Sequence, residues 1–449
     1  MGREGAGAVI ARRAFLAAMI ASAGATIASS PYALPGKRAL PPPRTVRLRW
    51  PWPTQLPDPY ALNDLTAALL GSTLFPPLYV RAIDGYLEPK LASAAPKEKK
   101  PGLRIDLMPN VRASDVVASI TKARAGGARL LLHDVPVPRI DGAHGVLFPF
   151  LADVDGLMHR LSSPLCGISR SEPHGLEPTG SFDVTLADSA SEGARILRLA
   201  RRALTGGALP PNAPSHVARF ELEGAIDLGA SLRAFERGDT DVGWLGDGLF
   251  EARTGARTMD LGPLAYLAMA AGTDAPELRN PGAVLGLVES IAWDRLGHLG
   301  LLRRGHVGRS TTAAFARAAP IVPARVPILV RASMPIVVAA AAAIARELGG
   351  APKAISDGEF DAALASRAFA LALEVVRPLD DSAEGAALSL ATFDGASIAP
   401  SLTQGPRGIA SSGRAALGWE ISLLGAQASD VWIPRAPFGG FDLEAGGVI

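Results

Sequence analysis

The sequence predicts an α/β protein with two lobes, each built on a mixed β-sheet. Two segments support this prediction because they share one plan, in which a strand, a short helix and an apolar strand follow one another. The first covers residues 216–245 and the second covers residues 328–375. A third observation is the length of the chain. Its 449 residues, of which 48% are hydrophobic and 20% charged, suffice for a large two-lobed body.

An export signal stands at the start of the sequence. Arg12 and Arg13 precede an apolar run of small residues that ends near Ala28, the usual layout of a secretory signal. The RRxFL pattern narrows this signal to the twin-arginine route, which is a targeting address and not an anchor. We expect residues 1–30 to be the signal, with cleavage near Ser29 and a periplasmic or otherwise extracytoplasmic location. The alternative is an uncleaved anchor helix, although a membrane span needs roughly 20 strongly apolar residues.

Composition and motifs argue against several classes of function. The net charge of +2 indicates no nucleic-acid partner. Cys166 is the only cysteine, which excludes an intramolecular disulfide, a multi-cysteine metal site and a lipid-bearing cysteine near the N-terminus. The seven histidines have no metalloprotease spacing, and neither a phosphate-binding Gly-rich loop nor a GxSxG motif is present. We therefore expect no cofactor and no metal, and an exported enzyme with an unrecognised site is kept as an alternative.

Residues 31–44 predict a Pro-rich linker, and the elements of the first lobe follow it. Residues 134–183 are rich in proline and predict loops. The predicted elements are a strand over 45–50, a helix over 61–70, a strand over 103–107, a helix capped by Ser114, a strand over 129–133 and an amphipathic helix over 191–204 with a basic outer face.

The two segments with a shared plan come next. In the first, a strand over 216–222 leads to a helix over 230–237, which Gly238 ends, and then to a buried strand over 242–245. The second contains a strand over 328–330 and then a helix that runs to Leu348, with Pro335 near its first turn and Gly349 at its end. A strand over 353–355, a helix over 360–366 and a buried strand over 369–375 follow. Between the two segments, residues 283–302 carry a long helical pattern.

Eight short segments occur in a recognisable order between residues 45 and 434. They are Asp58–Tyr60, Leu74–Tyr79, Gly85–Ala92, Leu103–Leu107, Ser114–Ile120, Pro178–Phe182, Phe235–Val242 and Asp430–Pro434. This series resembles the motif order of the extracellular solute-binding proteins of peptide/nickel-type ABC transporters (family 5), which have the type II periplasmic binding protein fold. The most specific single match is Phe235–Val242, which is similar to the family's "L.SGEVDI" motif.

The resemblance implies a two-lobed binding protein of type II architecture that closes on its ligand by a hinge motion. We expect lobe I over residues 45–262, lobe II over residues 263–392 and a return to lobe I over residues 393–449. The implied partners are a small solute, expected to be a peptide, and the membrane permease of an ABC transporter. The binding protein itself is expected to be a monomer.

Candidate ligand-binding residues lie where apolar strands end. Tyr60 follows the first strand, Trp244 and Asp247 end the buried strand of the first paired segment, and Asp381 follows that of the second. The resemblance implies that an acidic residue at the position of Asp381 pairs with the amino terminus of a peptide.

Each candidate also has a structural interpretation. Tyr60 can pack at the start of its helix, and Trp244 can be a core aromatic residue. Asp247 precedes a glycine, which is a common turn signal, and Asp381 can be a solvated loop residue.

Departures from the family's motifs leave a functional alternative open. The segment 109–113 is shorter than its counterpart in the family, and Ser181 stands where the family usually has proline. These differences are compatible with a receptor or scaffold that has kept the binding fold and lost transport.

Overall fold

The structure is a computed structural model that describes residues 44–82, 85–172, 175–189, 195–202, 215–224, 233–244, 255–279, 283–291, 296, 299, 326–379, 383–395, 414–437 and 439–448. By its internal contacts the chain divides into two units, Met1–Pro42 and Pro43–Ile449, and every described residue belongs to the second. The predicted signal and nearly all of the predicted linker lie outside the described residues. Within the described ranges, no helix is both long and apolar enough to span a bilayer.

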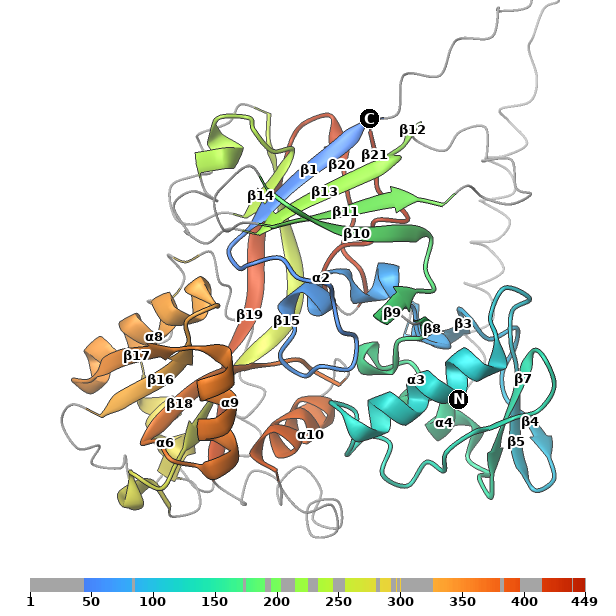
Figure 1. Cartoon of the computed structure of the whole chain (residues 1–449), viewed down its shortest axis with the longest axis horizontal. Coiled ribbons are helices and arrows are strands. Elements are labelled where there is room, and N and C mark those ends of the chain that lie inside the picture. Colours follow the sequence, from blue (N-terminus) through green and yellow to red (C-terminus); the bar gives the residue numbers. More distant parts are fainter. Residues whose placement is uncertain are drawn as a thin grey trace, which may run out of the picture. The chain divides into compact units, whose positions relative to one another are not determined.

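A ten-stranded mixed sheet organises the described residues (Figure 1). In sheet order its strands are β10 (Phe182–Asp188), β11 (Arg195–Arg201), β13 (Arg219–Gly224), β1 (Thr45–Trp50), β14 (Val242–Trp244), β19 (Ala415–Gln427), β15 (Arg257–Ala271), β18 (Leu371–Val376), β16 (Pro327–Arg331) and β17 (Ala351–Ile355).

The sheet has two halves, and each of them is mixed. In one half, β1 runs parallel to β13 and β14, whereas β11 is antiparallel to β13. In the other half, β16 runs parallel to β17 and β18, whereas β18 is antiparallel to β15. The predictions of an α/β fold, of a mixed sheet in each lobe and of parallel strands in both paired segments are therefore confirmed.

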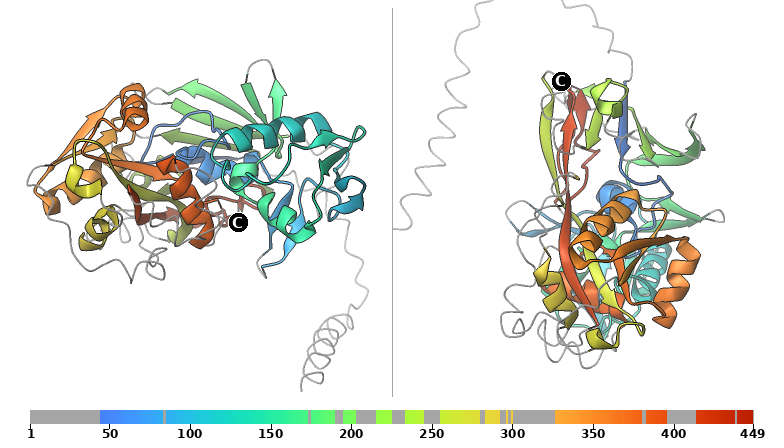
Figure 2. Two further views of the ribbon diagram at one scale, coloured as in Figure 1. Left: turned by 90° about the horizontal axis from the view of Figure 1, so that it is seen from below. Right: turned by 90° about the vertical axis from the view of Figure 1, so that its left-hand side faces the viewer.

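Two long strands make the halves continuous, which the sequence analysis did not predict. β15 and β19 pair antiparallel from Arg257 opposite Gln427 to Ala270 opposite Ala415. Figure 2 shows this pair running from one half of the sheet to the other. The pairing is interrupted by register shifts between Asp260 and Ala265, next to Gly262, which has a positive φ of 71°.

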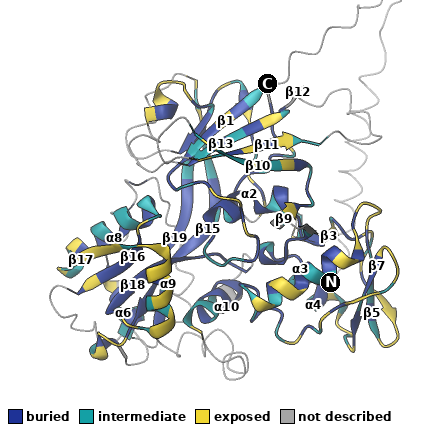
Figure 3. Ribbon diagram, viewed as in Figure 1, coloured by how far each residue is buried: buried dark blue, intermediate teal, exposed yellow. Residues whose placement is uncertain are grey.

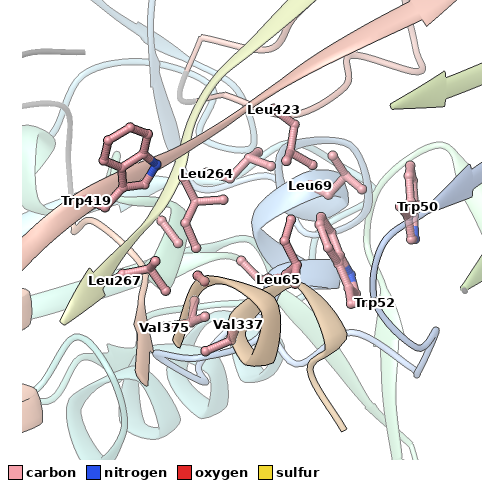
Figure 4. Close-up of a cluster of buried hydrophobic side chains, with 14 of the residues drawn as sticks. Trp50, Trp52, Leu65, Leu69, Leu264, Leu267, Val337, Val375, Trp419 and Leu423 are labelled. Carbon is pink, nitrogen blue, oxygen red and sulfur yellow. The ribbon is translucent and has the colours of Figure 1, made fainter. Parts of the chain in front are cut away.

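Helices cover both faces of the second half of the sheet. Val337 of α8 packs in the same apolar cluster as Val330 of β16, while Phe360 of α9 packs in another with Leu329. Neighbouring strand residues point to opposite faces, so α8 and α9 cover different sides of the sheet. The first of these clusters is shown in Figure 4. The helices are α2 (Leu65–Leu74), α3 (Ala113–Ala125), α4 (Val154–Arg160), η1 (Pro164–Cys166), η3 (Pro276–Arg279), α6 (Ala283–Ser290), α8 (Pro335–Leu348), α9 (Asp357–Ser366) and α10 (Ala383–Asp394).

A separate apolar cluster lies beneath a small four-stranded sheet, and we call it the small-sheet core. It joins Ile105 and Phe148 of that sheet to Ile120 of α3 and, notably, to Leu388 of α10. Figure 3 shows buried and exposed residues side by side along α3. The sheet contains β4 (Lys97–Lys99), β5 (Gly102–Asp106), β7 (Gly145–Pro149) and β6 (Arg139–Ile140), and the remaining short strands are β2 (Tyr79–Arg81), β3 (Leu87–Pro89), β8 (Ser169–Glu172), β9 (Gly175–Pro178), β12 (Ser215–His216), β20 (Val431–Trp432) and β21 (Gly447–Val448).

Several predicted boundaries are confirmed by local backbone chemistry. α8 begins at Pro335, whose fixed φ suits the first helical turn, and ends at Gly349 in the left-handed conformation. Gly238 also has a positive φ, and its N–H donates to the Phe235 carbonyl where the short helical turn over 233–236 ends.

The predicted amphipathic helix over 191–204 is wrong, because its described part is strand β11. Leu197 and Leu199 are buried two residues apart, so a period of two fits this stretch as well as a helical period. Pairing with strands on both sides decides the outcome: β11 lies between β10 and β13, and Arg198 forms an ion pair with Glu221 at 3.3 Å. Tertiary pairing thus overrides a local pattern that is ambiguous.

The prediction of a strand over 129–133 is also wrong. This stretch forms turns, in which the Leu132 N–H donates to the Ala128 carbonyl at 3.0 Å. Leu130 and Leu132 are both fully buried in the small-sheet core, which satisfies the apolar residues without a partner strand. The stretch predicted to be rich in loops, residues 134–183, also contains the short elements β6, β7, α4, η1, β8 and β9.

Other elements differ from the prediction at their ends. α2 starts at Leu65 and not at residue 61, because the Asp64 carboxylate accepts from the Ala67 N–H and caps the helix there. α3 starts at Ala113, so Ser114 is not its cap. The strand predicted over 216–222 is divided into β12 and β13. Of the helical pattern over 283–302, α6 is the helical part that the structure describes, and most of the remainder lies outside the described residues.

Gly180 connects β9 to β10 and touches the backbone of α2. A Cβ on Gly180 would lie 1.9 Å from the Thr73 carbonyl oxygen, which is far too close for two atoms that are not bonded. We expect Gly180→Ala to destabilise the protein by about 1–3 kcal/mol, the usual range for overpacking. Gly358→Ala in α9 is the control, because a Cβ there meets nothing within 4 Å and Ala favours a helix. Urea unfolding of both variants checks this prediction, and an equal stability of the two would contradict it.

Candidate ligand-binding site

A loop that follows β1 contacts the end of β18. We call this contact the junction and define it as residues 58–64 and residues 374–379. The Arg377 N–H donates to the Leu62 carbonyl at 2.7 Å. Ser163 extends the junction toward η1, since its hydroxyl donates to the Leu379 carbonyl. Leu379 itself packs in the small-sheet core together with Tyr60. Segments that lie more than 300 residues apart in sequence are therefore in direct contact here.

Arg377 supplies most of the polar contacts at this junction. Its Nη1 donates to the carbonyls of Pro59 at 3.2 Å and Ala61 at 3.0 Å, with a longer contact of 3.5 Å to Asp58. The residue is only 1% exposed. Burial lowers the pKa of the guanidinium to about 10, and the charges of Asp64 and Asp58 partly oppose that shift. The guanidinium is still protonated at neutral pH, so it is a buried cation that donates hydrogen bonds to several carbonyl oxygens.

Asp64 fixes the loop that Arg377 holds. Its carboxylate accepts from the Asp58 N–H at 2.8 Å and from the Ala67 N–H at 2.9 Å. Burial raises the pKa of this carboxyl group, while the two backbone donors and the charge of Arg377 lower it. The same aspartate therefore caps α2 and closes the loop 58–64.

A buried ion pair lies beside the junction on β18. Glu374 is 3% exposed and accepts from Arg331 Nε at 2.7 Å and from the Val375 N–H at 2.8 Å. Asn63 Nδ2 reaches the same carboxylate at 3.4 Å, so the loop 58–64 also touches this pair. Burial raises the pKa of Glu374, and the charge of Arg331 opposes that rise. Arg331 further contacts Asp361 at 2.6 Å.

The comparisons with known proteins identify the fold. No sequence profile of a known protein family matches the chain, and no curated protein matches it. Among solved structures, a dipeptide binding protein from Pseudoalteromonas sp. SM9913 in complex with Met-Leu matches with a TM-score of 0.67 at 12% identity, over 90% of this chain and 100% of that one. Haemophilus influenzae OppA in complex with the peptide RPPGFSPFR gives a TM-score of 0.67 at 10% identity, over 92% and 100%. NikA from Staphylococcus aureus in complex with Ni(L-His)2 gives 0.60 at 10% identity, over 88% and 97%.

The chain has the type II periplasmic binding protein fold. The resemblance found in the sequence is thus confirmed at the level of fold. The type II fold accounts for the continuous sheet, whose two mixed halves are linked by the β15–β19 pair. At the junction, the loop after β1 in one half of the sheet also hydrogen-bonds to the end of β18 in the other half.

Two of the four predicted site residues belong to the described part of this type II fold, and both are buried. Tyr60 is 6% exposed, and its hydroxyl shares a hydrogen bond of 2.8 Å with Ser169 Oγ. Burial raises the pKa of the Tyr60 phenol, so it is neutral at physiological pH. Trp244 is 3% exposed at the end of β14, opposite Gly425 of β19. Tyr60 lies within the junction, whereas Trp244 lies on the main sheet.

The two predicted carboxylates, Asp247 and Asp381, lie outside the described residues. By sequence, Asp381 comes four residues after Arg377, so the junction leads directly to it. The roles of all four residues in ligand binding stay predictions.

Sequence reasoning missed the charged residues of the junction. Glu374 stands inside the apolar run Leu371–Val376, and Arg377 follows that run directly. An ionisable residue within a buried strand is rarely tolerated without a partner, and this is the signal that was available. The partners themselves, Arg331 and the loop 58–64, come from distant parts of the chain and could not be read from local patterns.

Two observations on the described residues concern nucleophiles and metal ligands. Burial raises the pKa of the Cys166 thiol to about 12, so this cysteine is not an activated nucleophile. Among the residues that the structure describes, no three His, Cys, Asp or Glu side chains are grouped in a way that could hold a metal ion.

Proposed function

We propose that this chain is an exported solute-binding protein that captures a peptide-like small solute between two lobes and delivers it to an ABC permease. The observation that carries the proposal is the fold: two mixed half-sheets joined by a long strand pair, with a second connection at the junction. Two structures of similar fold contain peptides, Met-Leu in one and RPPGFSPFR in the other. Export rests on the twin-arginine pattern at Arg12 and Arg13, and the protein is proposed to act as a periplasmic monomer.

The irregular stretch of β15 supports the proposed division into lobes. The register of the β15–β19 pair shifts between Asp260 and Ala265, at the proposed boundary between residues 262 and 263. A bulged stretch in a connecting strand bends more easily than a regular ladder. We propose that this stretch is one element of the hinge, with lobe I over 45–262 and 393–449 and lobe II over 263–392.

The proposed ligand contacts come from residues at strand ends. Asp381 is proposed to pair with the ammonium group of a peptide, and Asp247 to contribute a second carboxylate from the other lobe. Tyr60 and Trp244 are proposed to form apolar walls beside them.

A thermal-shift series on the full chain tests the proposal. Dipeptides and longer peptides should raise the melting temperature, since a ligand at 100 times its Kd stabilises the folded state by about 2.7 kcal/mol. Nickel–histidine complexes and sugars provide the competing ligand classes, and Asp381→Asn should abolish the shift given by peptides. If no ligand class stabilises the protein, solute binding is contradicted.

One observation favours a second candidate, a receptor or scaffold that no longer transports. At the junction, Arg377 already occupies the carbonyls of Pro59 and Ala61, and Leu379 is buried in the small-sheet core. Protein atoms thus occupy the described part of the junction. Small-angle scattering distinguishes the candidates: a binding protein should become more compact with peptide, whereas a scaffold should scatter identically with and without it.

A further inference from the structure

A cavity of about 400 Å³ lies away from the junction. It is formed where the segment after β3, the strand β8 and the turn between β9 and β10 meet the C-terminal segment; Figure 1 shows β3, β8 and β9 in this region. None of its lining residues belongs to the junction. Those residues are Pro76, Lys90, Leu91, Asn110, Arg170, Thr179, Gly180, Ser181, Arg202 and Glu444.

The cavity has an excess of positive charge. Three cationic side chains and one carboxylate line it, which leaves a surplus of two positive charges. Lys90 is paired with Glu444 at 2.9 Å, and Arg202 is paired with Asp183 at 2.6 Å. Arg170 is half-buried on β8, and within the described ranges its side chain has no hydrogen-bonding or ionic partner. Glu177 lies directly opposite Arg170 in the β8–β9 register, but no ion pair joins the two described side chains. Arg170 is therefore the cation of the lining that is left to bind an anion.

Hydrogen bonds fix two other parts of the cavity wall, the turn between β9 and β10 and the C-terminal segment around Glu444. Ser181 Oγ donates to the Glu444 carboxylate at 2.7 Å. Arg201 donates to the carbonyls of Leu443 at 3.0 Å and Glu444 at 3.2 Å, which fixes the C-terminal segment. Arg202 donates to the Gly180 carbonyl at 3.0 Å and so fixes the turn. A wall that is ordered before a ligand arrives reduces the entropic cost of binding.

The remaining lining residues indicate what kind of anion fits. Pro76 and Leu91 give the cavity an apolar side, and the Asn110 amide adds a polar group beside the cations. An inorganic anion would leave that apolar side in contact with water, whereas an organic acid would cover it. A guanidinium fork matches the two oxygens of a carboxylate.

We propose that the chain has a second binding site in this cavity, which takes a small organic carboxylate. The carboxylate head contacts Arg170, and the apolar stem lies against Pro76 and Leu91. This site is independent of solute capture between the lobes, because it uses no residue of the junction and neither Asp247 nor Asp381.

Isothermal titration calorimetry on the full chain at constant ionic strength tests the site, with acetate, hexanoate and inorganic phosphate as probes. Hexanoate should bind one site and bind more tightly than acetate, because its stem covers the apolar side. Arg170→Gln should weaken hexanoate binding roughly tenfold or more, since a charge-assisted contact is lost. Arg195→Gln is the matched control: this arginine lies on β11, is mostly exposed and is outside the cavity, so affinity should not change.

Each other outcome overturns the proposal. Equal binding of phosphate and hexanoate would show a generic anion site and contradict the organic class. If Arg170→Gln keeps the natural melting temperature and binds hexanoate as tightly as before, the site lies elsewhere. If the natural chain does not bind hexanoate, the proposed site does not exist. Peptide stabilisation, measured in parallel, should be unaffected by Arg170→Gln, so failure of this site and failure of solute capture can be told apart.

Discussion

Arg331→Met should destabilise the protein by about 3–5 kcal/mol at neutral pH, the usual cost of removing one partner of a buried ion pair. Glu374 is 3% exposed, and without Arg331 its carboxylate would keep only the Val375 N–H and the distant Asn63 amide. The contact of Arg331 with Asp361 adds little to this cost, because Asp361 is largely exposed to solvent. The guanidinium also lies 4.6 Å from the Phe360 ring centroid, a favourable contact that the variant loses.

The pH dependence of this loss has a definite sign. Burial already raises the pKa of Glu374, and removing Arg331 removes a charge that lowers it. A folded-state pKa above the unfolded value means that stability is present at low pH and falls as the pH rises through the folded-state pKa. The difference in unfolding free energy between the natural chain and Arg331→Met should therefore be smaller at pH 5 than at pH 8.

Denaturant unfolding of a double-mutant cycle measures the effect. Arg331→Met combined with Glu374→Leu should recover much of the loss, because no unpaired charge is then buried. Arg346→Met in α8 is the control, since Arg346 is exposed and makes only a local contact with the Ala342 carbonyl. A double variant as unstable as Arg331→Met alone would contradict the argument.

The sequence could predict those elements that local chemistry determines. The C-terminal end of α8 was predicted as observed because Gly349 marks it, and Pro335 was correctly placed near the first turn. The parallel strands of the paired segments were predicted because two strands joined by a helix usually lie parallel in one sheet. By contrast, β15 and β19 were not predicted. Residues Leu264–Ala271 are buried without alternation between the two faces, so this half of β15 has no period of two.

The candidate site was predictable only in part. Strand ends directed attention to the region of Tyr60, because loops after parallel strands gather at one edge of a sheet. Its role in ligand binding stays a prediction. The burial of Tyr60 against Ser169 depends on packing between residues 109 positions apart, which no local pattern records. The cavity around Arg170 was missed for the same reason. Its lining comes from seven stretches of chain from Pro76 to Glu444, and each looks ordinary in isolation.

Arg377→Met should lower the free energy of unfolding by about 2–4 kcal/mol. The carbonyls of Pro59 and Ala61 would lose a charged donor, and each buried acceptor left without a partner costs about 1–3 kcal/mol. Relief of a buried cation offsets part of this cost, because burial lowers the pKa of Arg377 to about 10 and thus disfavours its charged form. The cost should exceed the relief, since the charges of Asp64 and Asp58 already stabilise the cation.

Hydrogen exchange together with urea unfolding checks where this loss arises. The Gly127 N–H bonds to the Tyr60 carbonyl at 2.9 Å, so its exchange should accelerate if Arg377 orders the loop 58–64. Arg198→Met on β11 is the control, because Arg198 is mostly exposed and its pairing with Glu221 should contribute less than about 1 kcal/mol. An Arg377→Met protein as stable as the Arg198→Met control, with unchanged exchange at Gly127, would mean that the Pro59 and Ala61 carbonyls find other donors. In that case Arg377 would not be what joins the end of β18 to the loop after β1.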